Sequence, residues 1–272
     1  MVRSLWSAAT GMNAQQTNVD TIANNLANVN TVGYKAQTAQ FKSLLYQTLQ
    51  TATTTANGDP KPTTSQVGLG VRNSSINSSF VQGPLLSSSS DTAFAIEGDG
   101  FFAIRGADGN TYYTRNGDFT WATNGGNRMI LTNQDGLPVL STTGRTITLG
   151  AGLIASRVTI SQSGEVCYPD ENNNPQSIGV SVGLYQFNNA GGLKRMGDSL
   201  WQATDASGRV LNEATNANLV PSRILQNYLE GSNVQVADEM VNLIVAQRAY
   251  EMNSKAITTT DEMMQTANNL KR

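Results

Sequence analysis

Apolar residues near the N-terminus recur at alternating intervals of three and four. The run consists of Leu5, Ala8, Met12, Val19, Ile22, Leu26 and Val29, and only Gln15 interrupts it. An average interval of 3.5 residues is typical of a helix that packs in a left-handed coil. We expect this helix to end near Asn30, because Gly33 can adopt the conformation that terminates helices.

A second run with the same spacing occupies the C-terminal end of the chain. It passes through Val236, Met240, Leu243, Gln247, Tyr250 and Ile257, and after a shift of one residue through Ala256, Thr260, Met263, Ala267 and Leu270. Such a shift changes the winding of a coil locally without ending the helix. Acidic residues in the first turns and Lys271 and Arg272 at the end suit the helix dipole. We therefore expect one long C-terminal helix.

Between the helices the pattern changes to short β-type runs. Residues 36–66 are polar after Leu49 and predict an extended arm or long loop, which could also lie as a strand on a neighbour. From Val67 onward, aromatic and β-branched residues alternate with turn sequences, which is typical of hairpins. These turn sequences lie at 98–100, 108–109, 116–117, 124–126, 134–136, 162–164, 170–175 and 188–192. We expect all-β structure from residue 94 to about residue 204.

Together these patterns predict an α+β fold. Its N- and C-terminal segments form one discontinuous coiled helical domain, into which an all-β domain and an extended arm are inserted. The expected boundaries are 1–35 and 225–272 for the helical domain, 36–93 for the arm with a connecting β segment, and 94–224 for the β-domain.

The composition predicts a polar but weakly charged surface. Charged residues make up 14% of the 272 residues and the net charge is -2, whereas about a quarter of residues are charged in typical proteins. Such a surface suits permanent packing against copies of the same chain. It provides no basic field for nucleic acid, and no apolar run is long enough to span a membrane. The first sixteen residues lack the apolar region of a signal peptide, which taken alone indicates the cytoplasm.

Several kinds of chemistry are excluded by residue type. Histidine is absent and Cys167 is the only cysteine, which excludes an internal disulfide, Ser-His-Asp and Cys-His catalysis and the commonest zinc ligand. Carboxylate pairs remain, but nearly all stand beside glycine or in turns, where aspartate bonds its own backbone. These acidic residues are Glu97, Asp99, Asp118, Asp135 and Glu165. We expect no catalytic residue, no cofactor and no metal.

Two short motifs resemble ligand sites in a loose form. Gly98-Asp99-Gly100 could begin a dinucleotide-binding fingerprint, but the fingerprint needs a helix where Phe101 continues a strand. Residues 170–175 could begin a calcium loop, but Pro175 stands where the sharp-turn glycine belongs and flanking helices are missing. We expect a tight turn and a hairpin loop instead.

Asn24, Asn25 and Asn28 are unusual for the last turns of a helix. Asparagine is a poor helix former, so three of them in so short a stretch need an explanation. Either the helix frays at its C-terminal end, or the amides bond to neighbouring helices in a dense assembly. The residues alone do not decide between these two interpretations.

The same asparagines belong to a motif that resembles a known family. Residues 22–31, followed by Gly33-Tyr34-Lys35, are similar to the N-terminal signature of bacterial flagellar rod and hook axial proteins. Residues 232–234 and 247–255 resemble the C-terminal signature of that family. Gly98, Gly100 and the strand through Ile104, followed by residues 113–117, resemble its central domain. The resemblance spans nearly the whole chain, with the weakest likeness between about 120 and 220.

The resemblance implies a structural polymer. Its partners would be copies of itself, the proximal rod and hook subunits, the ring bushing of the outer envelope and the flagellar type III export apparatus. Export of the unfolded chain without a cleaved signal peptide would place it in the periplasm. The expected assembly interface comprises Leu5, Met12, Val19, Ile22, Asn24, Asn25, Leu26, Asn28, Val29, Val236, Met240, Leu243, Gln247, Arg248, Tyr250, Asn253 and Ile257.

Within the family, the details favour a subunit of the distal part of the rod, forming a rigid hollow tube that transmits torque. They are residues 3–6, Gln15-Gln16, residues 44–48 and the polar stretch ending at 68–72. Another axial subunit, from the proximal rod or the hook, is the alternative. A secreted β-rich protein that binds or hydrolyses glycans is the alternative from a different class, and it would carry a signal peptide and ordered termini.

Overall fold

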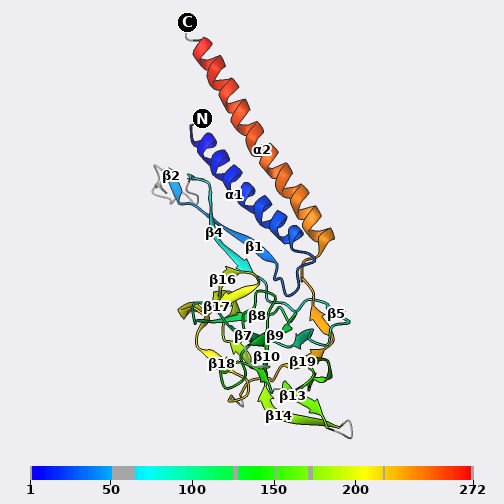
Figure 1. Ribbon diagram of the computed structural model, residues 1–272. Helices are drawn as coiled ribbons and strands as arrows, with labels where there is room; N and C mark the ends of the chain where they lie inside the picture. The colour runs from blue at the N-terminus through cyan, green and yellow to red at the C-terminus, as the bar shows by residue number, and fades with distance from the viewer. Residues whose placement is uncertain are drawn as a thin grey trace. The chain divides into compact units, whose positions relative to one another are not determined.

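The computed structural model describes residues 2–50, 65–124, 128–150, 152–170, 174–216 and 218–270. The chain divides into two compact units. The helical unit consists of Met1–Ala27, Gln37–Ser78 and Gln235–Arg272, and the β unit consists of Asn28–Ala36 and Ser79–Val234. The fold class is therefore α+β, with a helix at each end of the chain and a β-rich middle (Figure 1).

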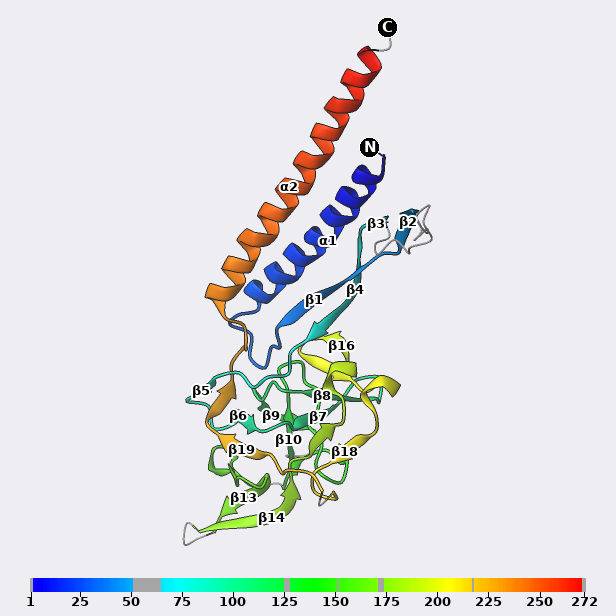
Figure 2. The same ribbon diagram turned by 180° about the vertical axis from the view of Figure 1, so that it is seen from behind.

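Two antiparallel helices dominate the helical unit. They are α1 (Val2–Ala27) and α2 (Val236–Asn269), which lie side by side in both views (Figures 1 and 2). Gly11 faces the side chain of Asn253, and Asn25 bonds Glu239. Both pairs of residue numbers add up to the same value, as an antiparallel register requires. The last turns of α2 therefore extend beyond the first turn of α1.

The C-terminal helix is continuous, as the sequence predicts, and it runs through the one-residue shift in the apolar pattern. The N-terminal helix ends at Ala27 rather than near Asn30. After it, Thr31 N–H bonds the carbonyl of Asn28 in a turn, and Gly33 N–H bonds the carbonyl of Glu230. Gly33 has a φ of 67°, so it reverses the chain within the β unit instead of terminating the helix directly.

The arm predicted for residues 36–66 is a strand ladder wherever the structure describes it. β1 (Gln37–Ser43) pairs antiparallel with β4 (Val71–Ser78), and β2 (Tyr46–Gln50) pairs antiparallel with β3 (Ser65–Gly68). Residues 51–64, which include most of the polar stretch, lie outside the described residues.

The β unit is built around a six-stranded antiparallel sheet of order β16-β17-β8-β7-β15-β18. Two three-stranded sheets, β11-β10-β9 and β12-β13-β14, and the pairs β19-β6 and β20-β5 complete it. The strands are β5 (Leu85–Ser87), β6 (Phe94–Glu97), β7 (Phe101–Arg105), β8 (Thr111–Thr114), β9 (Thr120–Asn124), β10 (Arg128–Thr132), β11 (Thr148–Leu149), β12 (Thr159–Ile160), β13 (Glu165–Pro169), β14 (Pro175–Ser181), β15 (Leu184–Phe187), β16 (Lys194–Gly197), β17 (Leu200–Gln202), β18 (Val210–Asn212), β19 (Arg223–Gln226) and β20 (Tyr228–Glu230).

Strand β7 explains why this sheet has a core on both faces. Because side chains alternate along a strand, Phe102 and Ile104 enter one apolar cluster while Phe101 and Ala103 enter another. All four are at most 1% exposed. The first cluster continues into the three-stranded sheets, and the second gathers aromatic side chains around Trp201.

The predicted turns have mixed outcomes. Residues 108–109 connect the paired strands β7 and β8, and residues 162–164 connect β12 and β13. β9 pairs with β10 and β13 with β14, as hairpins at 124–126 and 170–175 require, although residues 125–127 and 171–173 lie outside the described residues. A tight turn at 134–136 is closed by Gly136 N–H to the carbonyl of Asn133.

The hairpins predicted at 98–100, 116–117 and 188–192 are wrong. The first two segments each join strands of different sheets, and residues 188–192 join β15 and β16, which are not adjacent in the six-stranded sheet. Gly117 is needed for close approach, since a Cβ there would lie 1.6 Å from the carbonyl oxygen of Phe94. None of the helices in the described part of the chain is long and apolar enough to cross a membrane.

Candidate assembly surface and buried ion cluster

Helix α2 leaves most of its apolar side chains exposed. Among its described residues only Ala246 and Thr260 are buried. At 100° per residue, six exposed apolar residues fall on one side of the helix, here named the outer stripe. They are Val241, Ile244, Val245, Met252, Met263 and Leu270, with exposed fractions between 55% and 82%. Arg248, Lys255 and Glu262 lie on the same side of the helix, so the apolar side chains of the stripe alternate with charged ones. Exposed apolar side chains gathered on one side of a helix mark a candidate interaction site.

A second side of α2 faces α1. It comprises Glu239, Leu243, Ala246, Asn253, Ile257 and Thr260, all buried or half-buried. A Cβ on Gly11 would lie 2.9 Å from the amide nitrogen of Asn253. This glycine therefore lets the asparagine pack against the backbone of α1, and an alanine there would push the asparagine away.

The residues predicted to form the assembly interface divide between these surroundings. On α1, Ile22 and Asn25 are buried, Leu5, Met12, Val19 and Leu26 are half-buried, and Asn24 is exposed. On α2, Leu243, Asn253 and Ile257 are half-buried, and Val236, Met240, Gln247, Arg248 and Tyr250 are exposed. Asn28 and Val29 are half-buried in the β unit. The predicted C-terminal run included Met263 and Leu270 of the outer stripe, but it did not include Val241, Ile244, Val245 and Met252.

Asn25 has a role that neither interpretation of the asparagines foresaw. Its side chain accepts a 2.8 Å hydrogen bond from Gln37 N–H and donates one of 2.8 Å to the Gln37 carbonyl. It also donates to Oε1 of Glu239 at 3.1 Å. One buried amide therefore joins the end of α1, the start of β1 and the start of α2. Burial raises the pKa of Glu239, and the bond from Asn25 opposes that effect.

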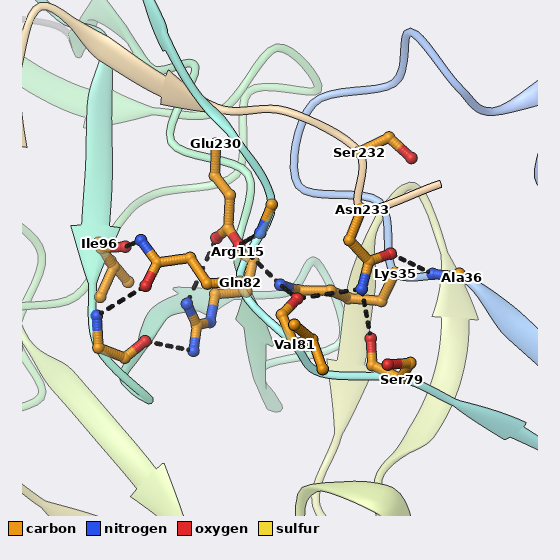
Figure 3. Close-up of polar contacts among 12 residues, drawn as sticks. Lys35, Ala36, Ser79, Val81, Gln82, Ile96, Arg115, Glu230, Ser232 and Asn233 are labelled. Carbon is orange, nitrogen blue, oxygen red and sulfur yellow. Dashed lines mark hydrogen bonds and ion pairs between the residues drawn. The ribbon is translucent and has the colours of Figure 1, made fainter. Parts of the chain in front are cut away.

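A buried ion cluster lies in the β unit (Figure 3). Glu230 Oε1 is 2.6 Å from Lys35 Nζ, and its Oε2 is 3.3 Å from Arg115 NH1. The exposed fraction of each of these side chains is at most 2%. Gly83 N–H donates to Oε1 of Glu230, Lys35 Nζ donates to the Val81 carbonyl, and Arg115 NH2 donates to the Gly98 carbonyl.

The electrostatics of this cluster are unequal. Burial lowers the pKa of Lys35 and of Arg115, and the charge of Glu230 opposes that shift for both cations. The one carboxylate thus compensates two desolvated cations. A buried charge without its partner is strongly unfavourable, so removal of Glu230 costs more than removal of either cation.

Around the cluster, Asn233 ties three chain segments together. Its Oδ1 accepts a 2.7 Å hydrogen bond from Ala36 N–H, and its Nδ2 donates to the carbonyls of Ser79 and Val81 at 2.9 and 3.0 Å. Ser79 N–H bonds the carbonyl of Ala36. The guanidinium of Arg195 stacks over Tyr34 and Trp201. The segment before β1 is therefore held from several directions.

The sequence contained only a weak signal for this cluster. Lys35 follows Tyr34, and Arg115 follows Thr114. A cation beside such a residue indicates, only weakly, that the charged side chain lies in a packed segment. Nothing in the sequence identifies Glu230 as their partner, because it lies 195 positions after Lys35.

The acidic residues considered for catalysis occupy turns and strand ends. Asp118 accepts from Gln134, Asp135 accepts from Asn133, and both contacts are exposed. Such contacts shape turns and place no carboxylate in a nonpolar cleft.

Comparison with known proteins decides what this architecture belongs to. A model of the flagellar basal body rod FlgEFG protein C-terminal region matches residues 225–270, one of the flagellar hook protein FlgE/F/G D1 domain matches 95–168, and one of the flagella basal body rod protein matches 5–35. The chain is 44% identical to the flagellar basal-body rod protein FlgG of Borreliella burgdorferi over the full length of both chains. This chain belongs to the flagellar basal-body rod protein family.

Other relatives agree with this assignment. The flagellar basal-body rod protein FlgG of Agrobacterium fabrum is 41% identical over 96% of this chain and 97% of its own. The flagellar hook-basal body complex protein FlhP of Bacillus subtilis is 30% identical over the full length of both. The matched regions lie at both ends and in the middle of the chain.

The three matched regions meet in the buried ion cluster. Lys35 is in the N-terminal match, Arg115 in the central match and Glu230 in the C-terminal match. The ion cluster therefore joins one side chain from each of the three matched regions, although these residues lie far apart in the sequence.

Proposed function

We propose that this protein is a structural subunit of the flagellar distal rod, where it self-assembles into a rigid hollow helical tube that transmits torque to the hook. The observation that carries the proposal is the outer stripe of α2, whose apolar side chains are each more than half exposed. Burial of one such side chain contributes about 1.5–3 kcal/mol, so a stripe repeated on every copy favours polymer formation. The rod names of its full-length relatives support the same function.

The exposed residues of α2 form the packing contacts within the proposed tube. Exposed Val236, Met240, Gln247 and Tyr250, together with the outer stripe, pack against helices of neighbouring copies in a coiled arrangement. The spacing of 3.5 residues supports this geometry. The two ends of the chain form the two halves of the helical domain. The β-domain is inserted between these halves in the sequence.

Specific partners and location extend the same proposal. The neighbours along the axis are like subunits, proximal rod subunits and the hook, and the neighbour around it is the ring bushing of the outer envelope. The flagellar type III export apparatus delivers the chain to the periplasm. Its role is mechanical rather than catalytic, and the turn positions of the acidic residues support this.

Electron microscopy of the purified full-length chain at high concentration tests the proposal. We expect filaments, and we expect Val241→Asp with Val245→Asp to abolish them, because each copy would bury two charges. Asn242→Asp is the matched control, since Asn242 is an exposed residue of the same helix, and it should leave filaments intact. Filaments that form equally well with the two aspartates in the outer stripe would overturn the proposed interface.

A further inference from the structure

The contacts of buried Glu230 and half-buried Asn233 link residues that precede the first strand to residues that precede the last helix. We name the set the latch: Lys35 with Glu230, Gly33 with Glu230, and Ala36 and Ser79 with Asn233. Every one of these residues belongs to the β unit. The latch therefore needs neither α1 nor α2 for its contacts.

The latch shortens the connection between the two helices. Along the chain, the 208 residues numbered 28–235 separate the end of α1 from the start of α2. The hydrogen bond from Gly33 N–H to the Glu230 carbonyl crosses this stretch. With that bond formed, only residues 28–33 on one side and 230–235 on the other remain between the helices, about a dozen in all.

A shorter connection raises the effective concentration of one helix near the other. For a flexible connection this concentration falls as about the −3/2 power of its length. A reduction from 208 residues, all flexible in the unfolded chain, to about a dozen corresponds to a gain of about 70-fold when the β unit folds. If the latch alone opens, strands β5 and β20 still pair Leu85 with Glu230, so about 60 residues connect the helices and the latch itself accounts for about 10-fold. The gain exists as soon as the β unit has folded, whether or not the helices have formed.

We propose that the latch is a built-in device that holds the two chain ends together, so that α1 and α2 pair as if a short loop joined them. The β unit thereby prepares each subunit for assembly. The inference rests on the proposed function only in that paired helices are what the polymer packs. Asn233 and Lys35 act as positioning residues. Glu230 is the group that holds Lys35 and Gly33, and Asn233 holds Ala36.

The effective concentration can be measured directly in dilute monomer. In a Cys167→Ser background, Gln16→Cys and Tyr250→Cys place one thiol on each helix, since both residues line the same groove of the helical unit. Equilibration with reduced and oxidised glutathione reports the effective concentration of the two thiols. We expect Lys35→Met combined with Asn233→Ala to lower it by at least 3-fold and at most about 10-fold.

These substitutions leave Glu230 its bonds to Arg115 and to Gly83 N–H, so we expect the β unit to stay folded. If the double variant unfolds it, as near-ultraviolet circular dichroism would show, Asn233→Ala alone is used, with an expected decrease of at least 2-fold. Lys194→Met and Asn188→Ala are matched controls at exposed positions of the β unit, and they should change nothing.

Amide exchange at Gly33 shows whether the latch has opened, because its N–H bonds the Glu230 carbonyl, which neither substitution removes. Fast exchange at Gly33 with an unchanged thiol equilibrium would overturn the proposal, and so would unchanged protection at Gly33. A wild-type chain that never forms filaments would contradict the proposed function alone, since the thiol measurement requires no polymer.

Discussion

Lys35 Nζ lies 2.6 Å from Glu230 Oε1, and neither side chain exposes any surface to solvent. The two residues are 195 positions apart, and Arg115 binds the second oxygen of the same carboxylate. The cluster therefore closes the β unit with residues from the two outer parts and the middle of the chain. Its energetic asymmetry, two cations on one anion, leads to the first prediction.

Glu230→Ala should destabilise the β unit by about 3–5 kcal/mol, because it leaves two buried cations uncompensated. Lys35→Met should cost less, since Glu230 keeps Arg115. Thermal unfolding followed by tryptophan fluorescence checks this in a Trp6→Phe background, where the remaining Trp121 and Trp201 both lie in the β unit. Glu97→Ala, at the exposed end of β6, is the control. Equal costs for Glu230→Ala and Lys35→Met would contradict the asymmetry.

Gly33→Ala should destabilise the β unit for two separable reasons. Its φ of 67° is unfavourable for other residues, and a Cβ would lie 2.6 Å from the backbone nitrogen of Asn116. Gly144→Ala is the matched control, because its φ is 73° but nothing lies within 4 Å of the added carbon. We expect about 1–2 kcal/mol for the control and clearly more for Gly33→Ala in chemical denaturation. Equal costs would show that the close approach to Asn116 can relax.

The stability of the helical unit should fall as the pH rises above the usual carboxyl value near 4.5. Burial raises the pKa of Glu239 in the folded state, so the folded chain holds this proton to higher pH than the unfolded chain does. At a pH between the Glu239 pKa of the unfolded chain and that of the folded chain, the folded chain binds more protons than the unfolded chain does. The free energy of unfolding then decreases as the pH rises. Thermal unfolding of α2 in assembled filaments, followed by far-ultraviolet circular dichroism from pH 4 to pH 7, measures the slope.

Glu239→Gln should remove this contribution, because a neutral amide can still accept the bond from Asn25. Glu262→Gln, an exposed position on the same helix, is the control and should keep the slope. A slope that survives in Glu239→Gln would assign it to another group.

Both helices should be largely unfolded in the dilute monomer and fold on assembly. α2 buries only two of its described residues, whereas ordering each residue costs about 1–2 kcal/mol of backbone freedom. We expect fast amide exchange over α1 and α2 and slow exchange over the β unit, including 33–36 and 230–234. Strong protection of both helices in a verified monomer would show that they fold without neighbours.

Removal of residues 51–66 should leave the β unit unchanged and make the polymer more flexible. The stretch has no apolar core pattern, so we propose that it ties adjacent subunits together. Thermal unfolding of the monomer and the persistence length of filaments in electron micrographs measure the two effects. A less stable β unit with equally stiff filaments would assign the stretch to the core of the subunit.

The local patterns predicted the elements well where one period dominates. The 3.5-residue spacing identified both terminal helices, because a helix repeats its apolar side regardless of what covers it. The apolar run through Phe101 and Ile104 predicted a strand that became the doubly buried β7. The turn at 108–109 also followed from local chemistry, because Asp108 bonds backbone two residues ahead of it.

Other features depended on which segments meet in space. The residues at 116–117 have the sequence of a hairpin turn, yet the strands on either side join different sheets. On α2 the inner side and the outer stripe share one period, so spacing alone could not tell which side faces α1. Asn25 and Glu230 acquired their roles from Gln37, Lys35 and Arg115.

The amino-acid sequence by itself therefore determined the helices, the β-rich middle and the family, because these depend on local periodicity and on long motifs. Only the tertiary structure decided the pairing of Lys35 with Glu230, the amide contacts of Asn25 and Asn233, and the face of α2 left uncovered. A hydrogen bond or ion pair between distant residues depends on the path of the whole backbone between them. That path is set by the summed packing of the β unit, which no single motif encodes.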